Sequence, residues 1–169
     1  MNKLIIDNRK FKSLVSDIAR QITLSGWRPD YIVGITRGGL LPAVMLSHYF
    51  NIPMHSLKIS LRDNVYCESN RWMAEGAIGF IPESSRKSFG GWKNLASQKK
   101  KILIVDDIND TGATINWILN DWRSNCLPDS DEWNDVWNNN VKFAVVVDNL
   151  ASNSNVKMDY YGLEVNKAL

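Results

Sequence analysis

The 169-residue sequence is poor in cysteine and in long apolar runs. Its two cysteines, Cys67 and Cys126, lie far apart without the spacing of metal ligands, so we expect free thiols in a reducing compartment. No window approaches the roughly 18 apolar residues that a membrane-spanning helix needs, and the first apolar stretch is too short for a signal peptide. These absences predict a soluble, cytoplasmic protein.

The sequence also lacks a strong charge of either sign. Its net charge is +2, and its only tight basic run, residues 99–101, is interpreted as a solvated lead-in to a strand. Binding to nucleic acid or to a membrane surface is therefore not expected. With 44% hydrophobic residues, the chain is long enough for one α/β domain with a real core and short for two, so we expect a single domain over 1–169.

The first third of the chain has the pattern of a parallel βαβ unit. Asp7 is placed to cap a helix whose apolar residues recur at helical spacing until Gly26 ends it. A buried strand is predicted over 31–35, a helix over 40–50 and another strand over 54–60. This order of strand, tight turn, helix and strand is typical of a right-handed parallel crossover.

The last third repeats the unit. An apolar strand over 102–105 precedes a helix with a buried stripe over 115–122, and a polar loop over 129–140 leads to a third strand over 141–148. Residues 159–165 are expected to form the last extended segment. The predicted fold class is α/β, with a mostly parallel twisted sheet flanked by helices.

Residues 61–98 show no convincing periodicity. A segment of this length without its own structure is usually functional. Two interpretations stay open: a long flexible lid with its hinge at 60–63, or an oligomer flap that does not move. Part of the segment is expected to pair as an irregular hairpin around 71–80.

Two turns carry the site chemistry: TRGG at 36–39 and DDINDTGAT at 106–114. Both follow predicted strands, and ligands of open parallel sheets bind beyond the carboxyl ends of the strands. The segment 111–114 opens a helix, where free backbone N–H groups and the positive end of the helix dipole favour an anion. It therefore predicts a cradle for a monophosphate.

The acids beside this cradle suggest a ligand with a second kind of group. Asp106 and Asp107 can accept hydrogen bonds from sugar hydroxyls and hold Mg²⁺, while Asp110 is placed to take a proton. The alternative is that these acids only cap a helix and face solvent. The joining of four polar residues, Asn109 included, to a TGAT turn favours a site.

The motif VDDINDTGAT resembles the phosphoribosyl-pyrophosphate signature of the type I phosphoribosyltransferases. The turn GITRGGLLPA is similar to the pyrophosphate loop of the bacterial xanthine-guanine branch, with Thr36 in place of the common serine. The match covers most of residues 4–165 and is weakest over 61–98 and at the tail. It implies a type I phosphoribosyltransferase-like domain.

The resemblance also implies roles for individual residues. Asp106 and Asp107 would bind the ribose hydroxyls and Mg²⁺, and Asp110 would be the general base or the partner of a purine N7. The loop residues implied to hold the 5′-phosphate are Thr111, Gly112, Ala113 and Thr114. Those implied to hold pyrophosphate are Thr36, Arg37, Gly38 and Gly39. The family's first loop often contains a strained or cis peptide, so the Thr36–Arg37 bond is expected to be unusual.

The sequence departs from the purine-specific pattern near its end. Those relatives usually end the third core strand with a lysine that reads the base, and here Asp148 and Asn149 stand in that region as candidate base-binding residues. The tail, 149–169, is also shortened. The base pocket is therefore completed by another element such as Trp72 or Trp92, or the chain is truncated, or the base is not a purine.

The activity implied is Mg²⁺-dependent transfer of the 5-phosphoribosyl group from phosphoribosyl pyrophosphate to hypoxanthine, guanine or xanthine. It yields a nucleoside monophosphate and pyrophosphate and serves purine salvage, in a homodimer or homotetramer. A second hypothesis is a regulator that senses phosphoribosyl pyrophosphate and binds RNA or a protein. A metal-dependent phosphatase built on the acid pair fits the TGAT turn poorly.

Overall fold

The computed structural model describes residues 5–61, 67–80 and 99–166. Its sheet has the order β2-β1-β3-β4-β5, and every neighbouring pair of strands is parallel. The strands are β1 (Tyr31–Thr36), β2 (Met54–Lys58), β3 (Ile102–Asn109), β4 (Val141–Asn149) and β5 (Tyr160–Val165). The predicted α/β class with a parallel sheet is confirmed.

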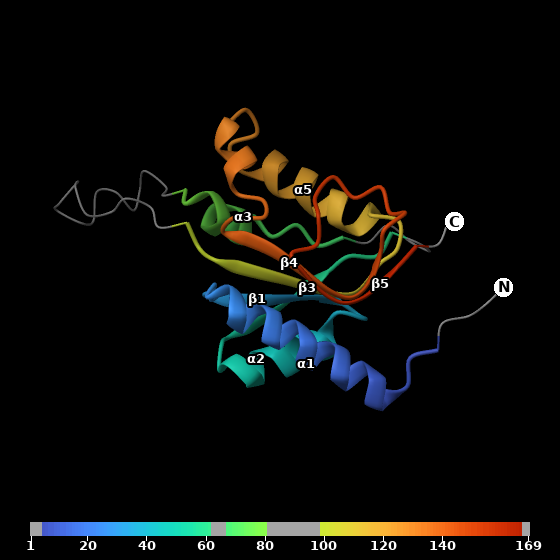
Figure 1. The fold of residues 1–169 in the computed structure, drawn as a ribbon. Coiled ribbons are helices and arrows are strands. Elements are labelled where there is room, and N and C mark those ends of the chain that lie inside the picture. Colours follow the sequence, from blue (N-terminus) through green and yellow to red (C-terminus); the bar gives the residue numbers. More distant parts are fainter. Residues whose placement is uncertain (1–4, 62–66, 81–98, 167–169) are drawn as a thin grey trace.

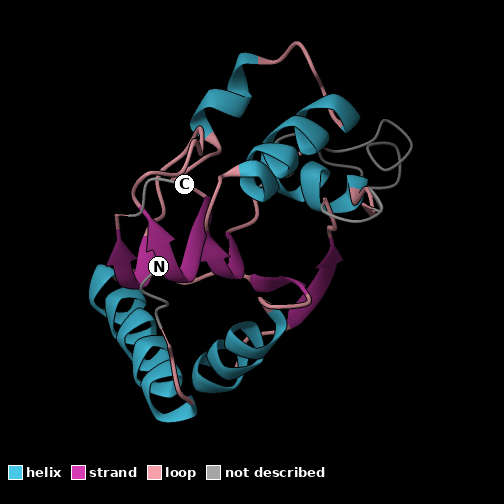
Figure 2. Cartoon of the chain, turned by 90° about the vertical axis from the view of Figure 1, so that its right-hand side faces the viewer, coloured by secondary structure: helices cyan, strands magenta, loops and turns pink. Residues whose placement is uncertain are grey.

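Helices cover both faces of this sheet (Figures 1 and 2). They are α1 (Asn8–Ser25), α2 (Leu40–Phe50), α3 (Arg71–Ile78) and α5 (Ala113–Asn125), with a short 3-10 helix η1 (Asp131–Asp135). Figure 1 shows α1 and α2 on one face and α3 and α5 on the other. Within the described ranges, no helix combines the length and apolar content needed to cross a membrane.

The first helix begins and ends where its sequence signals predict. The Asp7 carboxylate accepts a hydrogen bond from the backbone N–H of Lys10 at 2.7 Å, which satisfies one of the free donors at the helix start. Gly26 ends the helix in the left-handed conformation, with a φ of 69°. The buried stripe from Leu14 to Ile22 packs on the sheet.

The protein has two apolar cores, one on each face of the sheet. A strand contributes side chains to both cores because successive side chains point to opposite faces. In β3, Leu103 and Val105 join the core under α1 and α2, whereas Ile102 and Ile104 join the core under α3 and α5. Both faces of the central strands are covered, so their sequences are continuous apolar runs rather than alternating ones.

Two expectations about irregular segments are wrong. The predicted hairpin around 71–80 is instead the helix α3, because Met73, Ala74, Ala77 and Ile78 form a buried stripe at helical spacing. The polar loop over 129–140 contains η1, whose Trp133 is fully buried. Two parts of the proposed lid, 62–66 and 81–98, lie outside the described residues.

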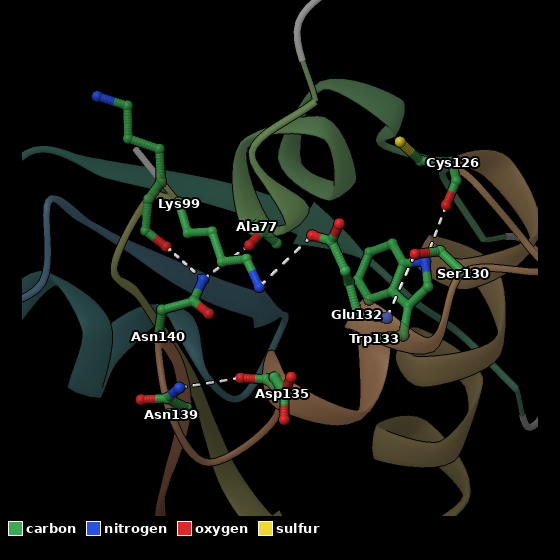
Figure 3. A network of polar contacts seen from close by, with 10 residues as sticks. Ala77, Lys99, Cys126, Ser130, Glu132, Trp133, Asp135, Asn139 and Asn140 are labelled. Carbon is green, nitrogen blue, oxygen red and sulfur yellow. Dashed lines mark hydrogen bonds and ion pairs between the residues drawn. The ribbon is translucent and has the colours of Figure 1, made fainter. Parts of the chain in front are cut away.

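Hydrogen bonds fix the amino ends of the strands to the helical layer (Figure 3). The Asn140 side-chain amide donates to the carbonyl oxygens of Ala77, at 2.8 Å, and Lys100, at 2.9 Å. The Trp133 indole N–H donates to the carbonyl oxygen of Cys126 at 2.9 Å. Both cysteines are free thiols, as expected. This end of the sheet is a scaffold, opposite the loops that carry the predicted site chemistry.

Candidate functional site

A cleft of about 770 Å³ lies at the carboxyl ends of β1, β2 and β3. It is lined by residues 35–38, 58–61 and 106–115, so it joins the two turns singled out in the sequence. The strand order explains its place. The chain leaves β1 toward α2 on one face and leaves the adjacent β3 toward α5 on the other, and such a divergence opens a crevice.

The first loop lies against β3 because two of its residues have no side chain. A Cβ atom added at Gly38 would overlap the Asp107 carboxylate, and one added at Gly39 would overlap the β3 backbone. The peptide bond between Thr36 and Arg37 is cis, which confirms the expectation of an unusual bond there. Arg37 lines the cleft, and its fork of N–H donors suits phosphate oxygens.

The acid pair belongs to the end of β3 and not to the following turn. The strand was predicted to end at Val105, but its pairing with β4 continues to Asn109. Asp106 is 9% exposed, and its carboxylate accepts the N–H of Asp107 at 2.9 Å. Asp107 in turn accepts the N–H of Ile108 at 2.9 Å. Burial, followed by the neighbouring charge of Asp107, raises the pKa of Asp106 to about 8.

The acid pair fits Mg²⁺ by the chemistry of its donors. Mg²⁺ is usually bound through one or two carboxylates together with substrate phosphates and water. Asp106 and Asp107 supply two neighbouring carboxylates in the cleft, and the described part of the chain holds no larger cluster of potential metal-binding side chains. A cation beside them would also favour the ionised form of Asp106, which burial disfavours.

Replacing Asp106 by asparagine is expected to change how stability depends on pH. The pKa of Asp106 is raised from 3.8 to about 8 by folding, so the folded state holds this proton more tightly than the unfolded chain. The free energy of unfolding should therefore fall as the pH rises from about 4 through 8. The Asp106→Asn variant keeps the accepting oxygen but cannot ionise. Its stability should match that of the wild type near pH 4 and exceed it by at least about 1 kcal/mol near pH 9 in urea unfolding, without Mg²⁺.

The control for this measurement is Asp129→Asn, which changes an exposed carboxylate outside the cleft. It should shift stability by less than about 0.5 kcal/mol at either pH. A wild type and an Asp106→Asn variant with parallel pH profiles would contradict the raised pKa.

The second loop forms the start of α5. Gly112 is the N-cap residue with a φ of 82°, and a Cβ atom there would overlap the backbone of Asn153 and Ser154. The Ala113 N–H donates to the Thr111 hydroxyl at 3.3 Å. Since the N-cap residue has no side chain, the helix start presents backbone donors and its dipole to the cleft. This geometry suits a phosphate group.

Asp110 lines the same cleft, between the acid pair and the phosphate cradle in sequence. Its carboxylate oxygen Oδ1 and its carbonyl oxygen both accept hydrogen bonds from Asn149 Nδ2, at 3.3 and 3.2 Å. Asp110 is partly exposed, so it is not sealed off from a ligand in the cleft. A carboxylate with a fixed hydrogen-bond partner therefore lines the cleft.

The candidate base-binding residues do not line the cleft. Asp148 is 9% exposed and accepts a hydrogen bond from Asn109 Nδ2 at 2.8 Å, and Asn149 is 1% exposed. Their contact with a base stays a prediction that this geometry does not support. Trp72 packs against Tyr31 and His55, also away from the cleft lining. Trp92 lies outside the described residues.

Sequence reasoning did not assign several lining residues of the cleft to the site, and two of these, Lys58 and Ile108, bear on its chemistry. Lys58 is the last residue of β2 and lies level with Thr36 of β1 in the parallel register. Ile108 is 40% exposed although it is apolar. The signal for Lys58 was available, because the carboxyl ends of parallel strands share one edge of the sheet and β2 was predicted.

The cleft thus combines cationic and backbone donors with carboxylates. Arg37, Lys58 and the start of α5 favour anions, whereas the carboxylates of Asp106, Asp107 and Asp110 repel anions when ionised and favour hydroxyls, protons and cations. A ligand that satisfies both sets carries phosphate groups together with a polar, uncharged centre.

Comparison with known proteins agrees with this geometry. The family model described as the phosphoribosyl transferase domain matches residues 2–168. The chain belongs to this family. Xanthine phosphoribosyltransferase 1 of Saccharomyces cerevisiae is 24% identical over 70% of this chain and 59% of its own length. Xanthine-guanine phosphoribosyltransferase of Cereibacter sphaeroides is 32% identical over 54% of this chain and 46% of its own length.

The fold of this phosphoribosyltransferase-family chain is also found in solved structures. The crystal structure of purine phosphoribosyltransferase from Pyrococcus horikoshii superposes with a TM-score of 0.61 at 23% identity, covering 98% of this chain and 90% of that one. The type I phosphoribosyltransferase-like fold is therefore confirmed, and the relatives agree with the predicted likeness to the bacterial xanthine-guanine branch. The chain spans about 59% of the length of the yeast relative.

Proposed function

We propose that this chain transfers the 5-phosphoribosyl group of phosphoribosyl pyrophosphate to a purine base. The products are a nucleoside monophosphate and pyrophosphate. The observation that carries the proposal is the single cleft in which the loop at 36–38 meets the segment 106–115. The names of the relatives, which act on xanthine or on xanthine and guanine, support a purine as the acceptor.

The cleft offers a separate place for each part of the donor. The 5′-phosphate binds at 111–114, where the backbone donors of α5 begin. Pyrophosphate binds at 36–38, with the charges of Arg37 and Lys58 beside it. The ribose hydroxyls donate to the carboxylates of Asp106 and Asp107. Bound Mg²⁺ on these carboxylates would neutralise charge on the departing pyrophosphate.

Asp110 accepts the proton that the base nitrogen loses in the reaction. The bond from ribose C1 to the pyrophosphate oxygen breaks with its electron pair, and a nitrogen of the base forms the new bond to C1. That nitrogen must lose a proton, and Asp110 lies in the cleft with a carboxylate able to accept it. Positive charge develops on the ribose as pyrophosphate leaves, and nearby carboxylates stabilise that charge.

Ile108 supplies an apolar surface for the base. It lies two residues before Asp110 and is 40% exposed, and it lines the cleft. An exposed isoleucine beside polar groups is suited to contact the face of a planar ring, while Asp110 meets the ring's edge. The base would then lie over the end of β3.

A turnover assay tests the proposal. Protein, Mg²⁺ and phosphoribosyl pyrophosphate are mixed with hypoxanthine, guanine, xanthine, adenine or orotate in turn, and nucleotide formation and pyrophosphate release are followed. Turnover of at least one of the first three bases, with a kcat/KM at least about 10-fold above that for adenine and orotate, is expected. Binding of phosphoribosyl pyrophosphate without turnover of any base would contradict the proposal and favour the sensor hypothesis.

A further inference from the structure

We propose that Asn149 is a positioning residue that holds the Asp110 carboxylate in its reactive orientation. The inference rests on the proposed function for its kinetic consequence but not for its geometry. Asn149 is the last residue of β4 and is 1% exposed, so its side chain has no contact with solvent to explain its polarity. A buried amide needs hydrogen-bond partners, and the partners of Asn149 include the carboxylate of Asp110.

Hydrogen bonds to both Nδ2 and Oδ1 determine the orientation of the Asn149 amide. Its Nδ2 donates to the carbonyl oxygen and to the Oδ1 of Asp110, at 3.2 and 3.3 Å. Its Oδ1 accepts the N–H of Ala151 at 3.2 Å. A flipped amide would place oxygen against oxygen at Asp110 and N–H against N–H at Ala151, so only one orientation is favourable.

Side-chain hydrogen bonds also join the carboxyl ends of β3 and β4 to each other. Asn109 and Asp148 face each other in the β3–β4 register, and Asn109 Nδ2 donates to the Asp148 carboxylate at 2.8 Å and to the Ser152 hydroxyl at 2.9 Å. The next residues along the chain are Asp110, directly after β3, and Asn149, the last residue of β4. Asp110 therefore follows a rigid strand end, and Asn149 fixes the remaining rotation of its side chain.

This contact leaves a defined part of Asp110 for the substrate. Asn149 binds Oδ1, so Oδ2 can face the base nitrogen that loses its proton. A general base acts only within hydrogen-bond reach of that proton, and small misplacements of a reacting group cost large factors in rate. Loss of the Asn149 amide should therefore slow the chemical step without weakening the binding of phosphoribosyl pyrophosphate.

Asn116 provides a matched control in the same part of the molecule. Its Nδ2 donates to the Asn153 carbonyl oxygen at 2.9 Å, and its Oδ1 accepts the Asn155 N–H at 2.8 Å. It thus joins α5 to the loop that follows Asn149, but it neither lines the cleft nor bonds to Asp110. General loosening of this loop should affect variants of Asn116 and Asn149 alike, whereas misplacement of Asp110 affects only the latter.

The test is a kinetic double-mutant cycle. Asn149→Ala should lower kcat by about 10-fold to 100-fold and change the KM for phosphoribosyl pyrophosphate by less than about 3-fold. Asn116→Ala should keep kcat within about 3-fold of the wild type. In an Asp110→Asn background, Asn149→Ala should lower kcat by less than about 2-fold further, because the residue acts through Asp110. Multiplication of the two single losses would overturn the proposal.

Two further experiments test the inference even if the alanine variant does not fold or no base is turned over. Asn149→Leu preserves the buried volume and removes the amide, and it should repeat the kinetic result if the alanine variant does not fold. Crystal structures of the wild type and the Asn149→Leu variant should show Asp110 in one rotamer in the former and displaced in the latter. If no base is turned over, the proposed function fails and these structures decide; an unmoved Asp110 carboxylate would overturn the inference.

Discussion

Asp110→Asn is expected to lower kcat at least about 100-fold, equivalent to about 2.7 kcal/mol of transition-state stabilisation. The asparagine keeps the size of the side chain but cannot accept the proton that leaves the base nitrogen. The affinity for phosphoribosyl pyrophosphate should stay within about 3-fold of the wild type, because the donor's phosphates are held by other residues. Single-turnover kinetics and calorimetric titration with phosphoribosyl pyrophosphate measure the two quantities.

The control for Asp110 is the exposed Asp129, whose change to asparagine removes the same charge outside the cleft. Its kcat should stay within about 2-fold of the wild type. Normal turnover by Asp110→Asn would remove Asp110 from the role of general base, and weaker donor binding with unchanged kcat would assign it to donor binding instead.

Gly112→Ala has the second large expected effect. Gly112 has a φ of 82°, and a Cβ atom there would overlap the backbone of Ser154. The methyl group must therefore displace the loop at 153–154 or the phosphate cradle itself. We expect at least about 100-fold weaker binding of phosphoribosyl pyrophosphate and a loss of at least about 2 kcal/mol in the free energy of unfolding. Titration calorimetry and urea unfolding test the two effects.

Gly26→Ala separates the effect of the positive φ from the effect of the overlap with Ser154. Gly26 also has a positive φ, of 69°, but an added Cβ atom would meet nothing within 4 Å. This variant carries only the conformational cost of the left-handed region, about 1–2 kcal/mol, and it should bind phosphoribosyl pyrophosphate normally. Equal losses of donor binding in both variants would mean that overlap with Ser154 is not what makes Gly112 necessary.

The local signals in the sequence predicted much of the fold. The helix α2 was placed at its observed bounds, and α1 was given the Asp7 cap and the Gly26 end that the structure shows. These features depend on neighbouring residues, whose spacing is readable without a tertiary structure. The segment Arg71–Ile78 was missed because one short apolar stripe within a long polar segment is a weak periodic signal.

The two turns of the site were also predictable, because each combines a distinctive local composition with a position after an apolar strand. Glycines that permit close backbone approach and hydroxyl residues at a helix start are local requirements of phosphate binding. The contact of Gly38 with Asp107 was not predictable in the same way. This contact joins residues 69 positions apart in the chain (107 − 38 = 69), so it depends on β1 and β3 being neighbours.

The sequence by itself determined the kinds of groups that line this cleft: two turns whose composition suits phosphate groups, and the carboxylates at 106, 107 and 110. Only the tertiary structure decided which of those groups are buried, paired or free. The raised pKa of Asp106, the presence of Lys58 in the cleft and the contact of Asn149 with Asp110 all follow from strand order and register. Strand order and register depend on the packing of both faces of the sheet at once, and no short stretch of residues encodes that packing.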